Sequence, residues 1–233
     1  MKNIAVILAG GSGSRLGADR PKQFLPLKDG RTVLETCVNA FHQNEHIDEI
    51  AVVMLRDHIA EAQAFLPANR FPKIKYWIPG GKERWESSKN AIDVIYLVQQ
   101  RIGFPEEAIN VLLHDCARPF ISQNLITRVC EALLTHEAVT VALPVTDTIY
   151  VVEKKRQGET VVGVSPRKML RKAQTPQAFR LFLIADAYEE LQDEQKAKLT
   201  DDASVVLAAY DEDVFIIPGE ESNRKITYKE DLE

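Results

Sequence analysis

The stretch LAGGSGSRLGADRPKQFLPL, from Leu8 to Leu27, decides how the rest of this sequence is interpreted. It follows a short apolar run, Ile4 to Leu8, that is typical of a parallel strand buried on both faces. A strand that ends in a glycine-rich loop can bind phosphate closely, because glycine leaves no Cβ between backbone N–H groups and an anion. The sequence therefore predicts a phosphate-binding loop after the first strand.

Neither of the two best-known phosphate-binding motifs fits this loop. A Walker A motif ends in Gly-Lys followed by Ser or Thr, whereas Lys22 follows a proline and precedes a glutamine. A dinucleotide fingerprint needs the spacing G-x-G-x-x-G, but Gly11, Gly13 and Gly17 are one residue too widely spaced. The pattern argues against a P-loop protein and gives only weak support to a dinucleotide-dependent oxidoreductase.

The composition of the chain limits which classes of protein, ligand and cellular location fit this sequence. A chain of 233 residues with 45% hydrophobic residues can form one α/β domain with a substantial core. The net charge of −5 argues against nonspecific nucleic-acid binding, so the basic residues around Arg15 and Lys22 are better interpreted as a site for a small anion. Three cysteines without metal-ligand spacing favour free thiols in a reducing compartment. No apolar run approaches the ~20 residues that cross a bilayer, so we expect no signal peptide, no membrane partner and a cytoplasmic location.

Short apolar runs alternate with helical spacing along the chain, which predicts an α/β fold with a mostly parallel sheet. Beyond the first strand, we expect strands at about 50–55, 74–78, 110–113, 139–143 and 214–217. Helices are expected at about 33–41, 57–66, after the glycine turn 80–88, at 123–134, up to about 195, and from Asp201 onward. Residues 173–179 are expected to form an ordered loop. We see no internal repeat, and we predict one domain covering residues 1–233.

Residues 147–165 break this alternation. Two β-rich runs, 148–152 and 160–164, flank charged residues and the turn Gln157-Gly158, which predicts a protruding hairpin arm. An isolated two-stranded hairpin is only marginally stable in water. We therefore expect the arm to pack on a second copy of the chain, as a homodimer.

Two polar clusters are candidate ligand sites. His114 and Asp115 follow the strand at 110–113, and ligands of parallel sheets bind beyond the carboxyl ends of strands. Asp115 is a hard oxygen donor suited to Mg²⁺, although an ion pair with Arg118 that fixes the loop is the alternative. His114 is more simply interpreted as a packing residue. Ser87 could offer its hydroxyl to a ligand at a helix N-terminus, or could merely cap that helix.

Eight motifs follow one another along nearly the whole chain: LAGGSGSRLG, PKQFLPL, GGKERWESS, HDCARPF, PVTDTI, AQTPQAF, TDDAS and NRKIT. In this order they resemble one family, the cytidylyltransferases that act on sugar-alcohol phosphates. The resemblance is to the 2-C-methyl-D-erythritol 4-phosphate cytidylyltransferases, with the related ribitol 5-phosphate cytidylyltransferases close behind.

The resemblance implies a Rossmann-like nucleotidyltransferase fold, Mg²⁺ dependence, CTP as co-substrate and a homodimer whose arms help to close each other's sites. It also implies in-line attack of the polyol phosphate on the α-phosphorus of CTP, with release of pyrophosphate. The transition-state residues implied are Arg15 and Lys22, and fixed positive charge suits the charge that accumulates on the phosphoryl groups.

The resemblance also implies residues for each ligand. The nucleotide-binding residues would be Leu8, Ala9, Gly10, Gly11, Gly13, Gly81, Arg84 and Ser87. The metal ligand would be Asp115. The polyol phosphate would meet Arg118, Thr148, Arg167, Thr175 and Lys225, with Thr148 and Arg167 reaching in from the partner's arm.

Some positions depart from the methylerythritol type. The methylerythritol enzymes usually place Lys where Tyr150 stands, and have Asp-Arg and Leu-Trp where this chain has Pro166-Arg167 and Leu170-Arg171. These departures lean toward the ribitol type, whereas the motifs HDCARP and TDDAS lean toward the methylerythritol type. Methylerythritol phosphate is the leading acceptor, and ribitol 5-phosphate is the alternative. A non-catalytic nucleotide-binding dimer is a further alternative, which retention of Arg15 and Lys22 disfavours.

Overall fold

The computed structural model describes residues 1–11, 20–105, 108–210 and 213–232. Its main sheet contains the strands β1 (Lys2–Leu8), β2 (Glu49–Met54), β3 (Ile74–Pro79), β4 (Ile109–Asp115), β5 (Ala138–Pro144), β8 (Arg171–Arg180) and β9 (Phe215–Pro218). The helices are α1 (Val33–Gln43), α2 (Ile59–Phe65), α3 (Arg84–Arg101), α4 (Gln123–Ala132), α5 (Leu181–Glu190), α6 (Asp193–Lys196) and α7 (Asp202–Ala209), with short 3-10 helices η2 (Lys22–Phe24), η3 (Arg56–His58), η5 (Arg167–Met169) and η6 (Lys229–Leu232).

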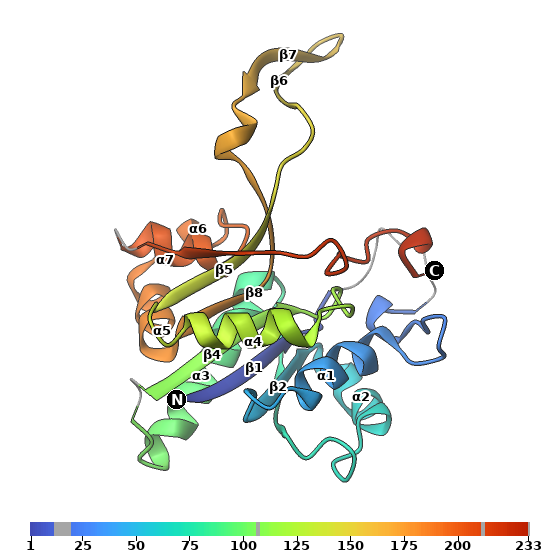
Figure 1. The fold of residues 1–233 in the computed structure, drawn as a ribbon, viewed down its shortest axis with the longest axis vertical. Coiled ribbons are helices and arrows are strands. Elements are labelled where there is room, and N and C mark those ends of the chain that lie inside the picture. The colour runs from blue at the N-terminus through green and yellow to red at the C-terminus, as the bar shows by residue number, and fades with distance from the viewer. Residues whose placement is uncertain (12–19, 106–107, 211–212, 233) are drawn as a thin grey trace.

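The sheet has the strand order β3-β2-β1-β4-β8-β5-β9, with helices on both faces (Figure 1). Strand β1 is an interior strand and pairs in parallel with β2 and β4, as the apolar run predicts. Its side chains alternate between two cores. Ala5 and Ile7 pack in the core under α1 and α4, whereas Ile4 and Val6 pack in the core under α3, α5 and α7. The α/β fold with a mostly parallel sheet is therefore confirmed.

Helix starts follow the local sequence signals. The Thr32 hydroxyl accepts a hydrogen bond from the Glu35 backbone N–H, and the Glu35 carboxylate accepts one from the Thr32 backbone N–H, which forms a capping box at the start of α1. Asp201 caps α7 in the same way, as predicted. In the described part of the chain, no helix is long and apolar enough to span a bilayer.

Residues 173–179 are not the ordered loop that the sequence predicts. They belong to β8, which lies between β4 and β5 and is antiparallel to both. The pairing with β5 joins Gln177 to Thr140 and Gln174 to Val141, so Thr175 and Pro176 are left out of the ladder. A proline within such a polar run argues against a central strand, and only this irregularity in register accommodates it.

Residues 147–165 form the predicted arm. Strands β6 (Ile149–Lys155) and β7 (Gly158–Ser165) pair in an antiparallel hairpin that is separate from the main sheet and projects away from it (Figure 1). Its apolar side chains are largely exposed, since Val152, Val161, Val162 and Val164 each keep half or more of their surface.

Gln177 connects β8 to the start of α7. The buried side chain accepts hydrogen bonds from the backbone N–H groups of Asp202 at 2.9 Å and Ala203 at 3.1 Å, and it donates to the Asp201 carboxylate at 2.8 Å. The first N–H groups of a helix have no partner inside the helix, so an outside acceptor is needed. Gln177 therefore fixes where α7 begins relative to the sheet.

We expect Gln177→Met to lower the free energy of unfolding by about 2–4 kcal/mol, because the buried N–H groups of Asp202 and Ala203 lose their acceptor. Urea unfolding measures this change. Gln100→Met, at an exposed position of α3, is the matched control and should cost less than about 0.5 kcal/mol. Equal losses in the two variants would contradict the structural role of Gln177.

Candidate active site

A cavity of about 200 Å³ lies at the carboxyl ends of β1 and β4. Ligands of parallel sheets bind at this edge, because the loops that follow neighbouring strands converge there. The cavity is lined by Leu8, Ala9, Gly10, Gly11, Lys22, Gln23, Val33, Gly81, Lys82, Glu83, Arg84, Ser87, Asp115, Cys116, Ala117 and Lys225. Segments from the start, middle and end of the chain thus share one pocket.

The structure brings together most of the residues that the sequence predicts for the nucleotide. Ten predicted site residues line the cavity: Leu8, Ala9, Gly10, Gly11, Lys22, Gly81, Arg84, Ser87, Asp115 and Lys225. Gly13 and Arg15 lie outside the described residues. Thr148 and Arg167 lie at the base of the arm, where Arg167 Nη1 donates to the Thr146 carbonyl at 3.1 Å.

The second glycine turn is built around Ser87. Its hydroxyl accepts from the Gly81 N–H at 3.1 Å and donates to the Glu83 carbonyl at 3.3 Å. Glu83, not Ser87, caps α3 through a capping box with Glu86. A Cβ on Gly81 would lie 2.2 Å from the Glu86 Cβ, so only glycine fits there. Ser87 therefore holds the turn against the helix at the cavity wall, and it is not the cap.

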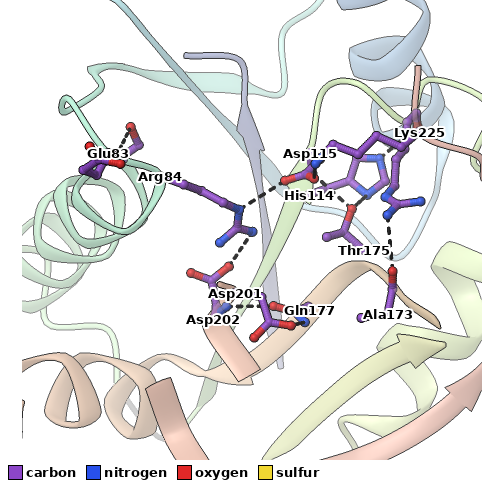
Figure 2. Close-up of polar contacts among 12 residues, drawn as sticks. Glu83, Arg84, His114, Asp115, Ala173, Thr175, Gln177, Asp201, Asp202 and Lys225 are labelled. Carbon is purple, nitrogen blue, oxygen red and sulfur yellow. Dashed lines mark hydrogen bonds and ion pairs between the residues drawn. The ribbon is translucent and has the colours of Figure 1, made fainter. Parts of the chain in front are cut away.

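Asp115 is the negative centre of the cavity (Figure 2). Its carboxylate accepts from Lys225 Nζ at 2.7 Å and from Arg84 Nε at 3.3 Å. Burial raises the pKa of Asp115, but the positive charges of Arg84 and Lys225 lower it by more than burial raises it. The pKa therefore lies well below the usual range for aspartate. Asp115 is therefore ionised and acts as a fixed charge. The expected alternative, an ion pair with Arg118, is not what holds this carboxylate.

Arg118 instead connects the site to two other segments. Its guanidinium donates to the carbonyls of Asn223 at 2.9 Å and Ala173 at 3.3 Å. Nε is buried and has no hydrogen-bond partner within the described part of the chain. Arg118 thus links the loop after β4 to β8 and to the C-terminal segment, just behind the lining of the cavity.

A buried chain of hydrogen bonds supports Asp115 from behind. The Thr175 hydroxyl accepts from the Asp115 backbone N–H and contacts His114 Nδ1, both at 3.1 Å. His114 Nε2 lies 3.0 Å from the Arg118 carbonyl, which can only accept, so Nε2 carries the proton and Nδ1 accepts from Thr175. Burial lowers the pKa of His114 to about 4, so the ring is neutral. The centre of the His114 ring lies 4.9 Å from the centre of the Phe41 ring, which confirms His114 as a packing residue.

The side chains at the cavity fit a metal ion that is held partly by the protein and partly by the phosphates of a substrate. Among the described residues, no three His, Cys, Asp or Glu side chains lie together so as to ligate a metal by themselves. Mg²⁺ commonly takes one or two carboxylates and completes its shell with substrate phosphates and water. Asp115, with its ionised carboxylate at the cavity, can supply that carboxylate.

Sequence reasoning missed Asp202 as a residue of this site. The motif TDDAS signals a helix start, and Asp202 is the first residue of α7. In the structure, its carboxylate lies 2.8 Å from Arg84 Nη2, whereas Asp115 contacts Nε of the same guanidinium (Figure 2). No local pattern could pair these two residues, because α3 and α7 meet only in the folded protein.

Known proteins match nearly the whole of this chain in sequence and in fold. The sequence model of the family described as 2-C-methyl-D-erythritol 4-phosphate cytidylyltransferase matches residues 3–233. The protein of that name from Thermobifida fusca is 41% identical over 230 residues, covering 98% of this chain and 89% of the relative. The corresponding structure from Francisella tularensis has a TM-score of 0.79 and 28% identity, covering 100% of this chain and 97% of the other.

A second kind of relative also matches. A bifunctional ribulose 5-phosphate reductase/CDP-ribitol pyrophosphorylase from Haemophilus influenzae is 35% identical over 232 residues. The match covers 99% of this chain and 47% of that protein. The α/β fold implied by the resemblance is confirmed by the solved structures.

We expect Thr175→Val to lower the free energy of unfolding by about 1–3 kcal/mol, because the Asp115 N–H and His114 Nδ1 lose a buried partner. Thr175→Ser keeps the hydroxyl and should recover most of that loss. Thermal and urea unfolding of both variants measure the difference. If Thr175→Val cost less stability than Thr175→Ser, methyl packing and not the hydroxyl would stabilise this part of the site.

Proposed function

The chain belongs to the 2-C-methyl-D-erythritol 4-phosphate cytidylyltransferase family, and we propose that it transfers the cytidylyl group of CTP to 2-C-methyl-D-erythritol 4-phosphate. It is a nucleotidyltransferase with an α/β fold. The single observation that best supports the proposed site is the cavity at the end of β1 and β4. There Gly10, Gly11, Lys22, Arg84 and Asp115 surround one space.

The proposed reaction is a direct transfer. An oxygen of the acceptor's phosphate attacks the α-phosphorus of CTP, and the bond from that phosphorus to the oxygen bridging to the β-phosphate breaks. The bonding electrons leave with pyrophosphate, and the product is the CDP-polyol. The attacking phosphate is already an anion, so neither a general base nor a covalent enzyme intermediate is needed.

The cations around the cavity supply what this reaction needs. Negative charge accumulates on the α-phosphoryl group and on the leaving pyrophosphate. Lys22 lines the cavity beside the glycine loop, where a Cβ on Gly11 would lie 3.7 Å from its Cε. We assign Lys22 to stabilise that charge, a contribution of roughly 3 kcal/mol for one preorganised donor. Arg15 stays a prediction, because it lies outside the described residues.

Asp115 would hold Mg²⁺ together with the phosphates of CTP. The bound ion would neutralise phosphate charge during the transfer. The glycines and Ser87 form the other side of the cavity, where we place the nucleoside. This arrangement leaves Lys225, which lines the cavity next to Asp115, for the acceptor phosphate.

The acceptor site needs residues that one copy of the chain keeps apart. Arg118 and Thr175 lie just behind the cavity, whereas Thr148 and Arg167 belong to the arm. We propose a homodimer in which each arm brings Thr148 and Arg167 to the partner's cavity. The exposed valines of β6 and β7 support this arrangement, since a lone two-stranded hairpin is marginally stable. All three cysteines are free and buried, which suits the cytoplasmic location we propose.

Ribitol 5-phosphate is the second candidate acceptor. The relative from Haemophilus influenzae, named as a CDP-ribitol pyrophosphorylase in one of its two activities, is 35% identical to this chain. Departures from the methylerythritol type fall at Tyr150 and at 166–171, next to the proposed acceptor residue Arg167. Acceptor choice would then be decided at the arm.

We expect pyrophosphate release from CTP and Mg²⁺ to be fastest with 2-C-methyl-D-erythritol 4-phosphate, slower with ribitol 5-phosphate and negligible without an acceptor. Lys22→Ala should lower kcat by about 100-fold or more, because one preorganised cation is lost. Lys28→Ala, at an exposed position nearby, is the matched control and should keep kcat within about 2-fold. Faster turnover with ribitol 5-phosphate would reverse the acceptor assignment, and no release with either acceptor would overturn the proposed function.

We expect the purified protein to sediment as a dimer, and Val162→Lys to shift it toward monomer by placing a charge on the arm surface. Leu97→Lys on α3 is the control, because Leu97 is exposed to almost the same fraction, 53% against 54% for Val162. Analytical ultracentrifugation over a concentration series measures the shift. A wild-type monomer, or equal shifts in both variants, would rule out the arm as the contact between subunits.

A further inference from the structure

Asp202 is a fully buried carboxylate that the proposed reaction does not use directly. One of its oxygens accepts a hydrogen bond from the Tyr188 hydroxyl at 2.8 Å, and the other lies 2.8 Å from Arg84 Nη2. A buried charge is costly unless it is paired and hydrogen-bonded, and Asp202 has both kinds of partner. Its place in the fold is therefore tied to that of Arg84.

Arg84 sits where a cation is unfavourable. It is the first residue of α3, so the positive end of the helix dipole lies beside its backbone, and its side chain is mostly buried. Burial lowers the pKa of Arg84, but the negative charges of Asp202 and Asp115 raise it by more than burial lowers it. The guanidinium is therefore positively charged. Two carboxylates together hold this cation at the wall of the cavity.

The two carboxylates differ in exposure to ligands. Asp115 lines the cavity and already shares its charge with Lys225, so a bound cation or substrate competes for it. Asp202 is 0% exposed and is not among the residues that line the cavity, and its carboxylate contacts the same guanidinium (Figure 2). Only Asp202 can remain the partner of Arg84 while the contacts of Asp115 change.

Asp202 is itself held rigidly. Its backbone N–H donates to Gln177 in the sheet at 2.9 Å, and its carboxylate accepts from Tyr188 on α5. As the first residue of α7, it also places a negative charge at the positive end of that helix. Contacts from β8 and α7 thus fix the backbone of Asp202 beside the Arg84 guanidinium.

We propose that Asp202 is a positioning residue, which holds the Arg84 guanidinium in place for the phosphates of CTP; this inference rests on the proposed function. A planar guanidinium binds phosphate best when its N–H groups are already aimed at the oxygens. A tethered side chain loses little rotational freedom when the nucleotide binds. Asp202 never touches the nucleotide, so its effect must pass through Arg84.

A mutant cycle tests this dependence. Asp202→Asn, Arg84→Gln and the double variant are compared with wild type by calorimetric CTP binding in Mg²⁺ and by the KM for CTP. We expect Asp202→Asn to weaken CTP binding and raise KM by about 10-fold, because the guanidinium loses its fixed anion. In the Arg84→Gln background, the same substitution should change both values by less than about 2-fold.

Equal losses in both backgrounds would overturn the proposal, because Asp202 would then act through the packing of α7. If Asp202→Asn alone fails to fold, Arg84→Gln and the double variant still make the decisive comparison, since the double variant buries neither charge. Tyr188→Phe removes one hydrogen bond from Asp202 and leaves the ion pair, so it should lower stability and keep KM within about 2-fold.

A KM for Tyr188→Phe as high as that of Asp202→Asn would also overturn the proposal. Wild-type protein that does not bind CTP would overturn both this inference and the proposed function. Wild-type protein that binds CTP no better than Asp202→Asn would overturn the inference alone. The binding measurement needs no acceptor, so it stays independent of which polyol phosphate is used.

Discussion

The parallel pairing of β1 with β2 and β4 is the constraint on which the site depends. The central residues of all three strands are mostly apolar and buried on both faces, so their register is set by packing under two layers of helices. Parallel strands end at the same edge. The polar loops after β1 and β4, together with the turn after β3, are therefore brought to one place, and the cavity forms between them.

Electrostatics then makes this edge suitable for a triphosphate in a protein whose net charge is −5. Lys22, Arg84 and Lys225 contribute positive charge to the cavity wall, and Asp115 is the ionised carboxylate between two of them. Placing Arg84 at the start of α3 puts a cation beside the positive end of a helix dipole. The buried Asp202 balances it from outside the cavity, so the wall can stay positive without an unpaired buried charge.

Strand β8 links these charges to the rest of the molecule. Thr175, left out of the ladder, supports the backbone of Asp115, and Gln177, two residues later, fixes the start of α7 and so the position of Asp202. Both carboxylates that hold Arg84 are thus positioned by one antiparallel strand. The irregular register that hides this strand from sequence analysis is also what turns Thr175 toward Asp115.

The sequence by itself determined the α/β order, the hairpin arm, the capped start of α7 at Asp201 and, through its motifs, the family. Apolar periodicity and capping residues act over a few positions, and the motifs are contiguous, so all of these could be recognised locally. It also identified most residues that line the cavity. Only the tertiary structure decided that residues 173–179 belong to a strand. It also decided that Asp115 pairs with Lys225 and Arg84, and that Asp202 forms an ion pair with Arg84. These ion pairs join residues that are far apart in the chain. A buried charge is stable only when it is paired, and no local sequence pattern shows which charges become buried.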